Sequence, residues 1–245
     1  MIAAGRSEYS IHTELYHTIK EIIMKRSLSG FVAVFSFMLF LSAGSAFAAE
    51  PLGVYVGLTG GYVIPQTLTI SDPDDSANYL DLTLKNGYLL GIKTGWNTPF
   101  TRRIMAMEVE YNYFNNNLDN STSVYGETYD GNMSVHAILF NLKARYPQGK
   151  FHPYIGGGLG YAYMSVGDIT ERGSNPQLIK GDSGSAFCWQ FLAGVDFDIT
   201  PNIGIGIGYK YFATKPTIGN RNSSDIYADF DYKTSVLTAG VIFTF

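Results

Sequence analysis

The sequence contains a single cysteine, Cys188, so it has neither an intramolecular disulfide nor a CxxC metal site. Charge is also scarce, because Asp, Glu, Lys and Arg make up only 16% of the 245 residues. No apolar run reaches the roughly 18 residues of a membrane-spanning helix. Glycine and aromatic residues are abundant instead, with 27 Gly, 18 Tyr and 16 Phe. We therefore expect one β-rich domain whose outer surface need not be wetted.

Residues 24–48 have the three parts of a secretory signal peptide. Two basic residues precede an apolar run from Phe31 to Leu41, and Ala46-Phe47-Ala48 forms an A-x-A cleavage site. The run is too short to anchor a helix in a membrane, and no cysteine follows the cleavage site to carry a lipid. We therefore predict export, with a mature domain that spans residues 49–245.

Residues 1–23 do not fit this leader, because they make its first part unusually long and include Glu8, Glu14 and Glu21. Lys20-Glu21 can be encoded by AAGGAG, a ribosome-binding sequence that would lie just upstream of Met24. We therefore predict that translation starts at Met24 and that residues 1–23 are a mis-assigned extension.

Eight segments of the mature chain alternate between apolar and small or polar residues, the period expected of strands. Each meets or exceeds the roughly nine to eleven residues with which a tilted strand crosses a bilayer. The segments are Gly53–Val63, Lys85–Asn97, Arg103–Phe114, Met133–Tyr146, Pro153–Val166, Ala186–Ile199, Ile203–Phe212 and Tyr232–Phe245.

The connections between these segments alternate in length. Those after the second, fourth and sixth segments are tight turns, whereas the others are long and polar. Short turns at one end and long loops at the other are the pattern of outer-membrane barrels. We expect the long connections to be unpaired external loops: Pro65–Leu84, Asn115–Asn132, Gly167–Ser185 and Ala213–Asp231.

The two faces of the segments also differ. In Arg103–Phe114, Met107 and Val109 share one side, while Glu108 and Glu110 share the other. Lipid outside and a polar interior require such a division, because lipid offers no partner to a charge. Aromatic residues gather near the segment ends and predict girdles at the two membrane interfaces: Tyr62, Trp96, Tyr111, Tyr113, Tyr146, Tyr161, Tyr163, Tyr209 and Tyr211.

Three glycine- and tyrosine-rich stretches, Val54–Tyr62, Pro153–Tyr161 and Gly206–Tyr211, together with the final Phe245, carry a family resemblance. The mature chain resembles the small eight-stranded outer-membrane β-barrels, the OmpA-like and opacity-protein-like group. The resemblance implies an all-β, eight-stranded antiparallel up-and-down transmembrane β-barrel in the bacterial outer membrane, with both termini periplasmic. It also implies that the outward residues of the last strand form an assembly signal: Leu237, Val241, Phe243 and Phe245.

The resemblance further implies the partners of the chain. Outer-membrane lipids and lipopolysaccharide would surround the barrel, and periplasmic chaperones and the β-barrel assembly machinery would insert it. A host or cell-surface ligand would meet the external loops. No segment follows the last strand, so we do not expect the peptidoglycan-binding domain of the larger relatives.

Alternation places four cationic and four anionic side chains inside the expected barrel: Lys93, Glu108, Glu110, Lys143, Arg145, Asp196, Asp198 and Lys210. Buried charges are costly unless they are paired. The interior of an eight-stranded barrel is just wide enough for side chains to fill it. We expect a balanced ion-pair plug and hence a structural or surface-interaction role, with a narrow porin-like channel for small or hydrophobic solutes as the alternative.

The sequence contains few residues arranged as a catalytic site would require. Ser134 and His136 lie two apart on one strand, as in a lipid A-modifying esterase, but no carboxylate shares their outward face to orient the histidine. We therefore do not expect an enzyme.

The sequence also predicts no cofactor, metal or nucleic-acid partner. Gly156, Gly158 and Gly160 lack the third glycine of a dinucleotide-binding loop, and we expect them to make room for long neighbouring side chains inside the barrel. Asp72-Pro73-Asp74-Asp75 lacks the spacing of an EF-hand. The long connections are acidic, with four Asp and no Lys or Arg in residues 65–84, which disfavours nucleic acid.

The orientation can be tested with protease on whole cells. Cuts should fall within the four long connections, because exposed loops are where nicking concentrates. Cuts at Pro99, Pro147 or Pro201 in the tight turns should require a permeabilised outer membrane. Mass spectrometry of the fragments would show the sites, and the opposite accessibility would invert the topology.

Overall fold

The computed structural model describes residues 53–64, 67–71, 79–117, 128–167, 169–172, 178–179, 181–219 and 228–245. Residues 1–52 lie outside the described part, so the extension at 1–23, the signal peptide at 24–48 and the mature start at residue 49 stay predictions.

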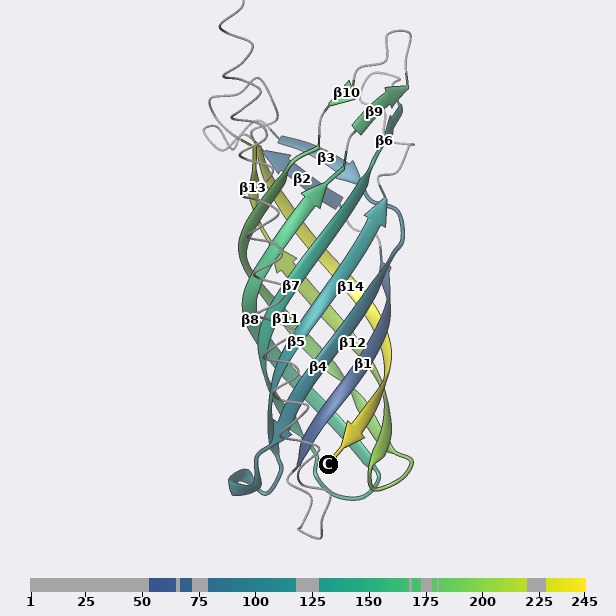
Figure 1. Cartoon of the computed structure of the whole chain (residues 1–245), viewed down its shortest axis with the longest axis vertical. Coiled ribbons are helices and arrows are strands. Elements are labelled where there is room, and N and C mark those ends of the chain that lie inside the picture. The colour runs from purple at the N-terminus through teal and green to yellow at the C-terminus, as the bar shows by residue number, and fades with distance from the viewer. Residues whose placement is uncertain are drawn as a thin grey trace, which may run out of the picture. The chain divides into compact units, whose positions relative to one another are not determined.

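Eight long strands form the body of the structure (Figure 1). Their bounds are β1 Val54–Ile64, β4 Gly87–Asn97, β5 Met105–Asn117, β7 Asn132–Arg145, β8 Phe151–Val166, β11 Ser183–Asp198, β12 Ile203–Thr214 and β14 Ala228–Thr244. Each pairs antiparallel with the next, and β14 closes the sheet on β1. The predicted eight-stranded up-and-down barrel is therefore confirmed, with strand ends shifted by a few residues.

Closure of the sheet satisfies the backbone of every barrel strand. In the closing pair, Gly57 lies opposite Ile242, and Tyr62 lies opposite Leu237. A closed sheet has no free edge, and this is the condition that a β-structure must meet in lipid. The described residues contain no helix that is long and apolar enough to span a membrane.

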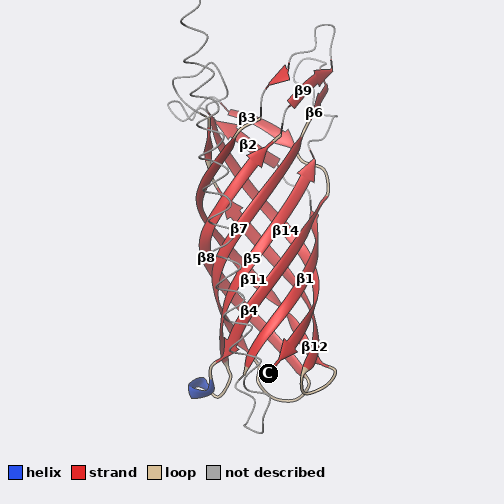
Figure 2. Cartoon of the chain, viewed as in Figure 1, coloured by secondary structure: helices blue, strands red, loops and turns tan. Residues whose placement is uncertain are grey.

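Tight turns close one end of the barrel. Pro99–Thr101 forms the only helical turn of the described residues, drawn in blue in Figure 2. The Thr98 hydroxyl donates to the Met105 carbonyl oxygen at 2.9 Å, which holds the two strand ends together. Gly149 in the β7–β8 turn has φ +75°, a conformation that favours glycine.

The long connections are not simply unpaired loops, so that expectation is wrong for part of each. They contain β2 Thr67–Ser71, β3 Tyr79–Thr83, β6 Thr128–Asp130, β9 Ile169–Arg172, β10 Leu178–Ile179 and β13 Thr217–Ile218. β2 and β13 pair with β14 near its first residues, and β6, β9 and β10 form a second small sheet. The cause is the length of β14, whose first residues offer backbone groups to strands outside the barrel.

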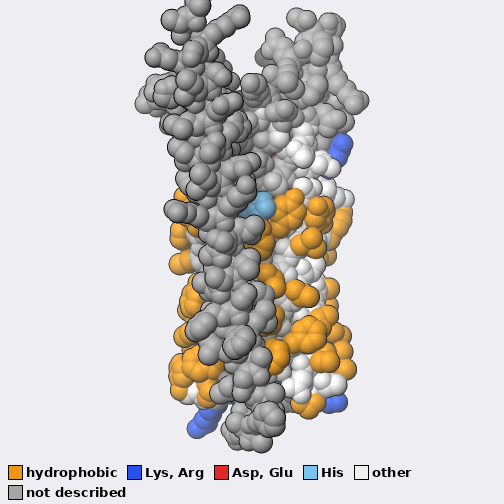
Figure 3. Space-filling model, viewed as in Figure 1, with side chains coloured by type: hydrophobic (Ala, Val, Ile, Leu, Met, Phe, Trp, Pro, Cys, Tyr) orange, Lys and Arg blue, Asp and Glu red, His pale blue; other side chains and the backbone are white. Residues whose placement is uncertain are grey.

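Hydrophobic side chains cover the outer wall between the two ends. Figure 3 shows them over the described part of the visible face, with Lys and Arg side chains near the ends. Leu58, Ile155 and Ile207 expose 54%, 67% and 67% of their surface. Such exposure would be unfavourable in water, but it suits a wall that faces lipid.

The interior has an apolar half. Phe114, Phe212 and Tyr232 are buried together, with 4.6 Å between the ring centroids of the two phenylalanines. All three lie at the strand ends that adjoin the long connections. Leu89 and Leu139, which alternation also places inside, belong to the same cluster. We call this buried group the apolar plug.

Candidate functional site in the barrel interior

Glu108 on β5 is the centre of a buried charged cluster. Its Oε1 accepts a hydrogen bond from the Tyr55 hydroxyl at 2.6 Å and lies 3.0 Å from Lys143 Nζ. Lys93 Nζ lies 3.5 Å from the same oxygen. Glu108 and Lys143 each expose only 2% of their surface. Four strands, β1, β4, β5 and β7, therefore meet at one carboxylate.

Lys143 extends this cluster to two more strands. Its Nζ lies 3.7 Å from Asp196 Oδ2 on β11. The same ammonium lies over the ring of Tyr154 on β8, at 4.1 Å from the centroid. A cation in this position is attracted by the face of the ring as well as by the two carboxylates.

Glu110 is the centre of a second cluster, one inward position further along β5. Its Oε2 accepts hydrogen bonds from Asn141 Nδ2 at 3.0 Å and from Gln190 Nε2 at 2.8 Å, and Lys210 Nζ on β12 pairs with its Oε1. Gln190 also donates to Asn141 Oδ1 at 2.8 Å. We call the Glu108 and Glu110 clusters together the charged network.

The charged network neutralises itself. Of the predicted lumen charges, the structure brings six into ion pairs: Lys93, Glu108, Glu110, Lys143, Asp196 and Lys210. Pairing offsets the cost of removing these charges from water, whereas loss of one partner would leave a buried charge alone. Sequence reasoning did not single out Tyr55, Asn141 and Gln190, although their inward positions between charged residues were readable from the alternation.

Glycines on the inward faces leave space for this network, as we expected for Gly156. A Cβ on Gly95 would lie 2.6 Å from the Tyr55 hydroxyl oxygen and 2.9 Å from Glu108 Cγ. A Cβ on Gly156 would lie 2.9 Å from Lys143 Cγ, and one on Gly206 would lie 2.6 Å from Asp196 Oδ1. The long charged side chains therefore occupy the volume that side chains at these positions would fill.

Little space remains inside the network. A gap of about 20 Å³ is lined by Lys93, Tyr154, Asp196 and Lys210 among others. That volume holds about one water molecule. Asn112 Nδ2 and Gln190 Oε1 are buried without a hydrogen-bond partner among the described residues, and neither residue lines this gap.

Arg145 and Asp198 depart from the expected ion-pair plug. Both line a cavity of about 260 Å³ at the short-turn end. Asp198 pairs with His152 Nε2 at 2.8 Å rather than with a lysine or arginine, and its side chain is 45% exposed. Arg145 has no ion pair within the described part of the chain. Both residues lie at strand ends. Alternation still predicts that their side chains face the interior there, but the barrel opens to solvent at these ends.

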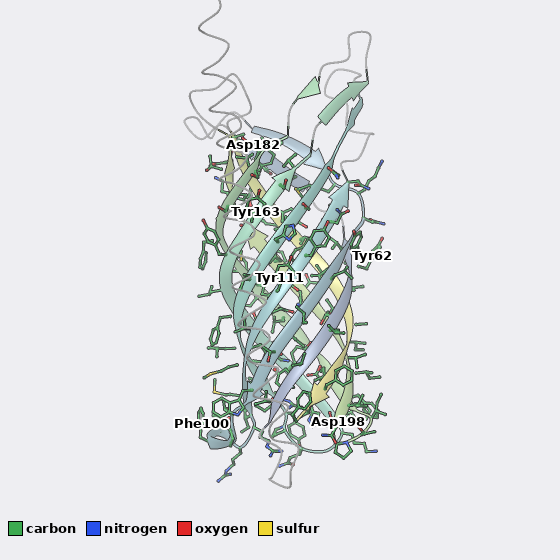
Figure 4. The ribbon with its side chains drawn as sticks, viewed as in Figure 1. Tyr62, Phe100, Tyr111, Tyr163, Asp182 and Asp198 are labelled. Carbon is green, nitrogen blue, oxygen red and sulfur yellow. The ribbon has the colours of Figure 1, made fainter. Side chains whose placement is uncertain are left out.

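The residues predicted for the girdles all lie on the outer wall. Tyr62, Trp96, Tyr146, Tyr161, Tyr163 and Tyr209 are exposed there, and Tyr111, Tyr113 and Tyr211 are half-buried. Figure 4 shows Tyr62, Tyr111 and Tyr163 nearer the long connections, opposite Phe100 and Asp198 at the short turns. Leu237, Val241, Phe243 and Phe245 are also exposed, and their role in assembly stays a prediction.

His136 on the outer wall is held by tyrosines. Its Nδ1 lies 2.7 Å from the Tyr111 hydroxyl, and its ring centroid lies 4.9 Å from that of Tyr113. Among the described residues, no hydrogen bond joins His136 to Ser134. Those residues also contain no group of three or more His, Cys, Asp or Glu that could hold a metal ion.

Comparison with known proteins gives the following similarities. The family model described as "Outer membrane protein beta-barrel domain" matches residues 33–245. The chain is 28% identical over 172 residues to a protein named "Outer membrane protein" from Gluconacetobacter diazotrophicus, which covers 65% of this chain and 45% of that protein. The chain spans about half the length of the curated relatives it matches.

The chain is also similar to solved structures at low sequence identity. Neisserial surface protein A is 19% identical, with 80% of this chain and 100% of that chain covered and a TM-score of 0.46. The outer membrane protein OprG from Pseudomonas aeruginosa is 16% identical, with 80% and 98% covered and a TM-score of 0.49.

Gly95→Ala tests the packing of the charged network. The new methyl group would collide with Tyr55 and Glu108, and we expect a loss of about 1–3 kcal/mol of unfolding free energy. Gly60→Ala is the matched control, because a Cβ on Gly60 meets nothing within 4 Å. Urea unfolding of the refolded barrels would measure both, and equal stability of the two variants would contradict the packing account.

Proposed function

Because the chain belongs to the outer membrane protein β-barrel domain family, whose model matches residues 33–245, we propose that it serves as a closed structural and surface-interacting barrel. The protein is a transmembrane β-barrel of the bacterial outer membrane. The proposal adds that it is neither a conducting channel nor an enzyme. The observation that carries it is the filled interior.

Two barriers in series oppose solute passage. The charged network fills the middle of the barrel, and an ion would have to separate Glu108 from Lys143, or Glu110 from Lys210, to pass. The apolar plug follows on the side of the long connections, where Phe114, Phe212 and Tyr232 are in contact. Separating buried ion pairs and hydrating an apolar core are both unfavourable.

Contacts with the surroundings are therefore assigned to the outer surfaces. The wall would meet lipid and lipopolysaccharide. The long connections, with β2, β3, β6, β9, β10 and β13, would face the exterior and meet a cell-surface ligand. Their acidic sequence disfavours polyanionic ligands such as nucleic acid.

An esterase on the outer wall is less well supported. The group that holds His136 Nδ1 is the Tyr111 hydroxyl, not a carboxylate, and Ser134 is not hydrogen-bonded to His136 among the described residues. A Ser–His pair needs both the mutual contact and an orienting group to activate the serine.

Planar-bilayer recording tests the closed lumen. The refolded protein should show no stable single-channel current, because the charged network and the apolar plug leave no continuous water path. The control is a variant with the plug reduced, Phe114→Ala combined with Phe212→Ala, in which brief openings should become more frequent. Stable, large currents from the wild-type protein would instead establish the narrow-channel alternative.

A further inference from the structure

We infer that the β4–β5 turn, residues 98–104, binds the headgroup of an anionic phospholipid in the membrane leaflet at the short-turn end. The turn consists of the helical turn Pro99–Thr101 followed by Arg102 and Arg103. Figure 2 shows the helical turn to the side of the strand ends. It therefore lies at the level where the lipid-facing wall ends and the lipid headgroups begin.

Phe100 extends the lipid-facing wall into this turn. It exposes 73% of its surface, more than any other large hydrophobic side chain of the described residues. Its ring centroid lies 6.0 Å from that of Trp96, the wall residue near the end of β4, and Figure 4 shows Phe100 outside the strands. Ile104, at the other end of the turn, is 46% exposed. Such apolar exposure is unfavourable in water, so the occupant that suits this surface is the lipid around the wall.

The backbone of the turn is strained at two arginines. Arg102 and Arg103 have φ angles of 56° and 62°, and in the described part of the chain they are the two non-glycine residues with positive φ. This left-handed conformation is unfavourable for a residue with a Cβ atom, and glycine would adopt it more easily. Strained backbone concentrates at functional sites. An arginine retained at such a position therefore points to a role for its side chain.

Hydrogen bonds hold the turn in this conformation. The Thr98 and Thr101 hydroxyl oxygens lie 2.5 Å apart, and the Met105 N–H donates to Thr101 Oγ1 at 3.1 Å. The Arg103 N–H donates to the Thr98 carbonyl oxygen at 3.0 Å. The turn is thus ordered before it meets a ligand, which lowers the entropy lost on binding.

The charge of Arg102 selects the headgroup. Arg102 is exposed and makes no ion pair with the residues that the structure describes. Its guanidinium matches the oxygens of a phosphate group. A zwitterionic headgroup carries its own cation, which reduces the attraction, whereas an anionic headgroup does not. Phe100 among the acyl chains and Arg102 at the phosphate therefore favour an anionic phospholipid. The inference rests on the proposed contact between the outer wall and lipid, but it does not depend on the closed lumen.

Quenching of tryptophan fluorescence by brominated phospholipids tests the inference on the protein refolded into vesicles. The chain has two tryptophans, Trp96 beside the turn and Trp189 in the middle of β11. Trp189→Phe leaves Trp96 as the only fluorophore, and Trp96→Phe leaves Trp189. Trp96 should prefer phosphatidylglycerol over phosphatidylcholine about fivefold, the factor that one arginine near a membrane surface supplies. Trp189 should show no preference.

The two tryptophans separate the possible failures. Quenching of both without a headgroup preference at Trp96 would overturn the inference and leave the turn to a water-soluble partner. Absence of quenching of Trp189 by either lipid would contradict the lipid-facing wall itself, and with it the proposed function on which the inference rests.

Variants of Arg102 in the Trp189→Phe background give the matched comparison. Arg102→Gln should remove most of the preference, and Arg102→Lys should retain part of it. Arg102→Gly should also lose the preference but unfold in urea no more readily than the parent, because glycine relieves the strain. Lys215→Gln makes the same charge change at an exposed site beyond β12, at the end of the long connections, and should leave the preference unchanged. Equal losses in Arg102→Gln and Lys215→Gln would reduce the effect to overall charge and contradict the site.

Discussion

The buried carboxylate of Glu108 constrains the rest of the interior. It exposes 2% of its surface, and a carboxylate in such a position is tolerated only with cations and hydrogen-bond donors around it. Lys143, Lys93 and Tyr55 supply them from three other strands. The need to pair this one charge thus links strands that are far apart in the sequence and holds the barrel in one arrangement.

The wall of the barrel is adapted to that network. Long side chains cross the interior from one strand, and glycines on the facing strands give them room. Gly95 lies against Tyr55 and Glu108, and Gly206 lies against Asp196. Glycine at these inward positions is therefore a consequence of a narrow interior filled by long side chains.

The interior is divided along the barrel axis. The apolar plug occupies the side of the long connections, the charged network fills the middle, and the cavity with Arg145 and Asn97 opens at the short turns.

Much of this fold could be predicted from the sequence. Period-2 alternation and the alternating connection lengths gave the eight strands, and alternation alone put Glu108, Glu110 and Lys143 inside. Alternation could not predict which charges form ion pairs, because tilt and register decide which inward residues meet across the barrel. That is why Arg145 was expected in an ion pair that the described structure does not contain.

The short strands outside the barrel were missed for a different reason. Segments such as Thr67–Ser71 and Thr217–Ile218 are too short to show a period, and they become strands because β14 offers them unpaired backbone groups. The cavity was missed because its lining residues come from six strands and from the three tight turns. No local pattern connects Asn97 with Arg145.

A double-mutant cycle on Glu110 and Lys210 tests the central claim, that paired buried charges hold the barrel closed. Glu110→Gln and Lys210→Met should each lower the unfolding free energy in urea by about 3–5 kcal/mol, because each leaves the other charge buried alone. The double variant should lose less than either single variant, because it leaves no buried charge unpaired, so the two losses are strongly non-additive. Additive losses, or single variants as stable as the wild type, would contradict the account.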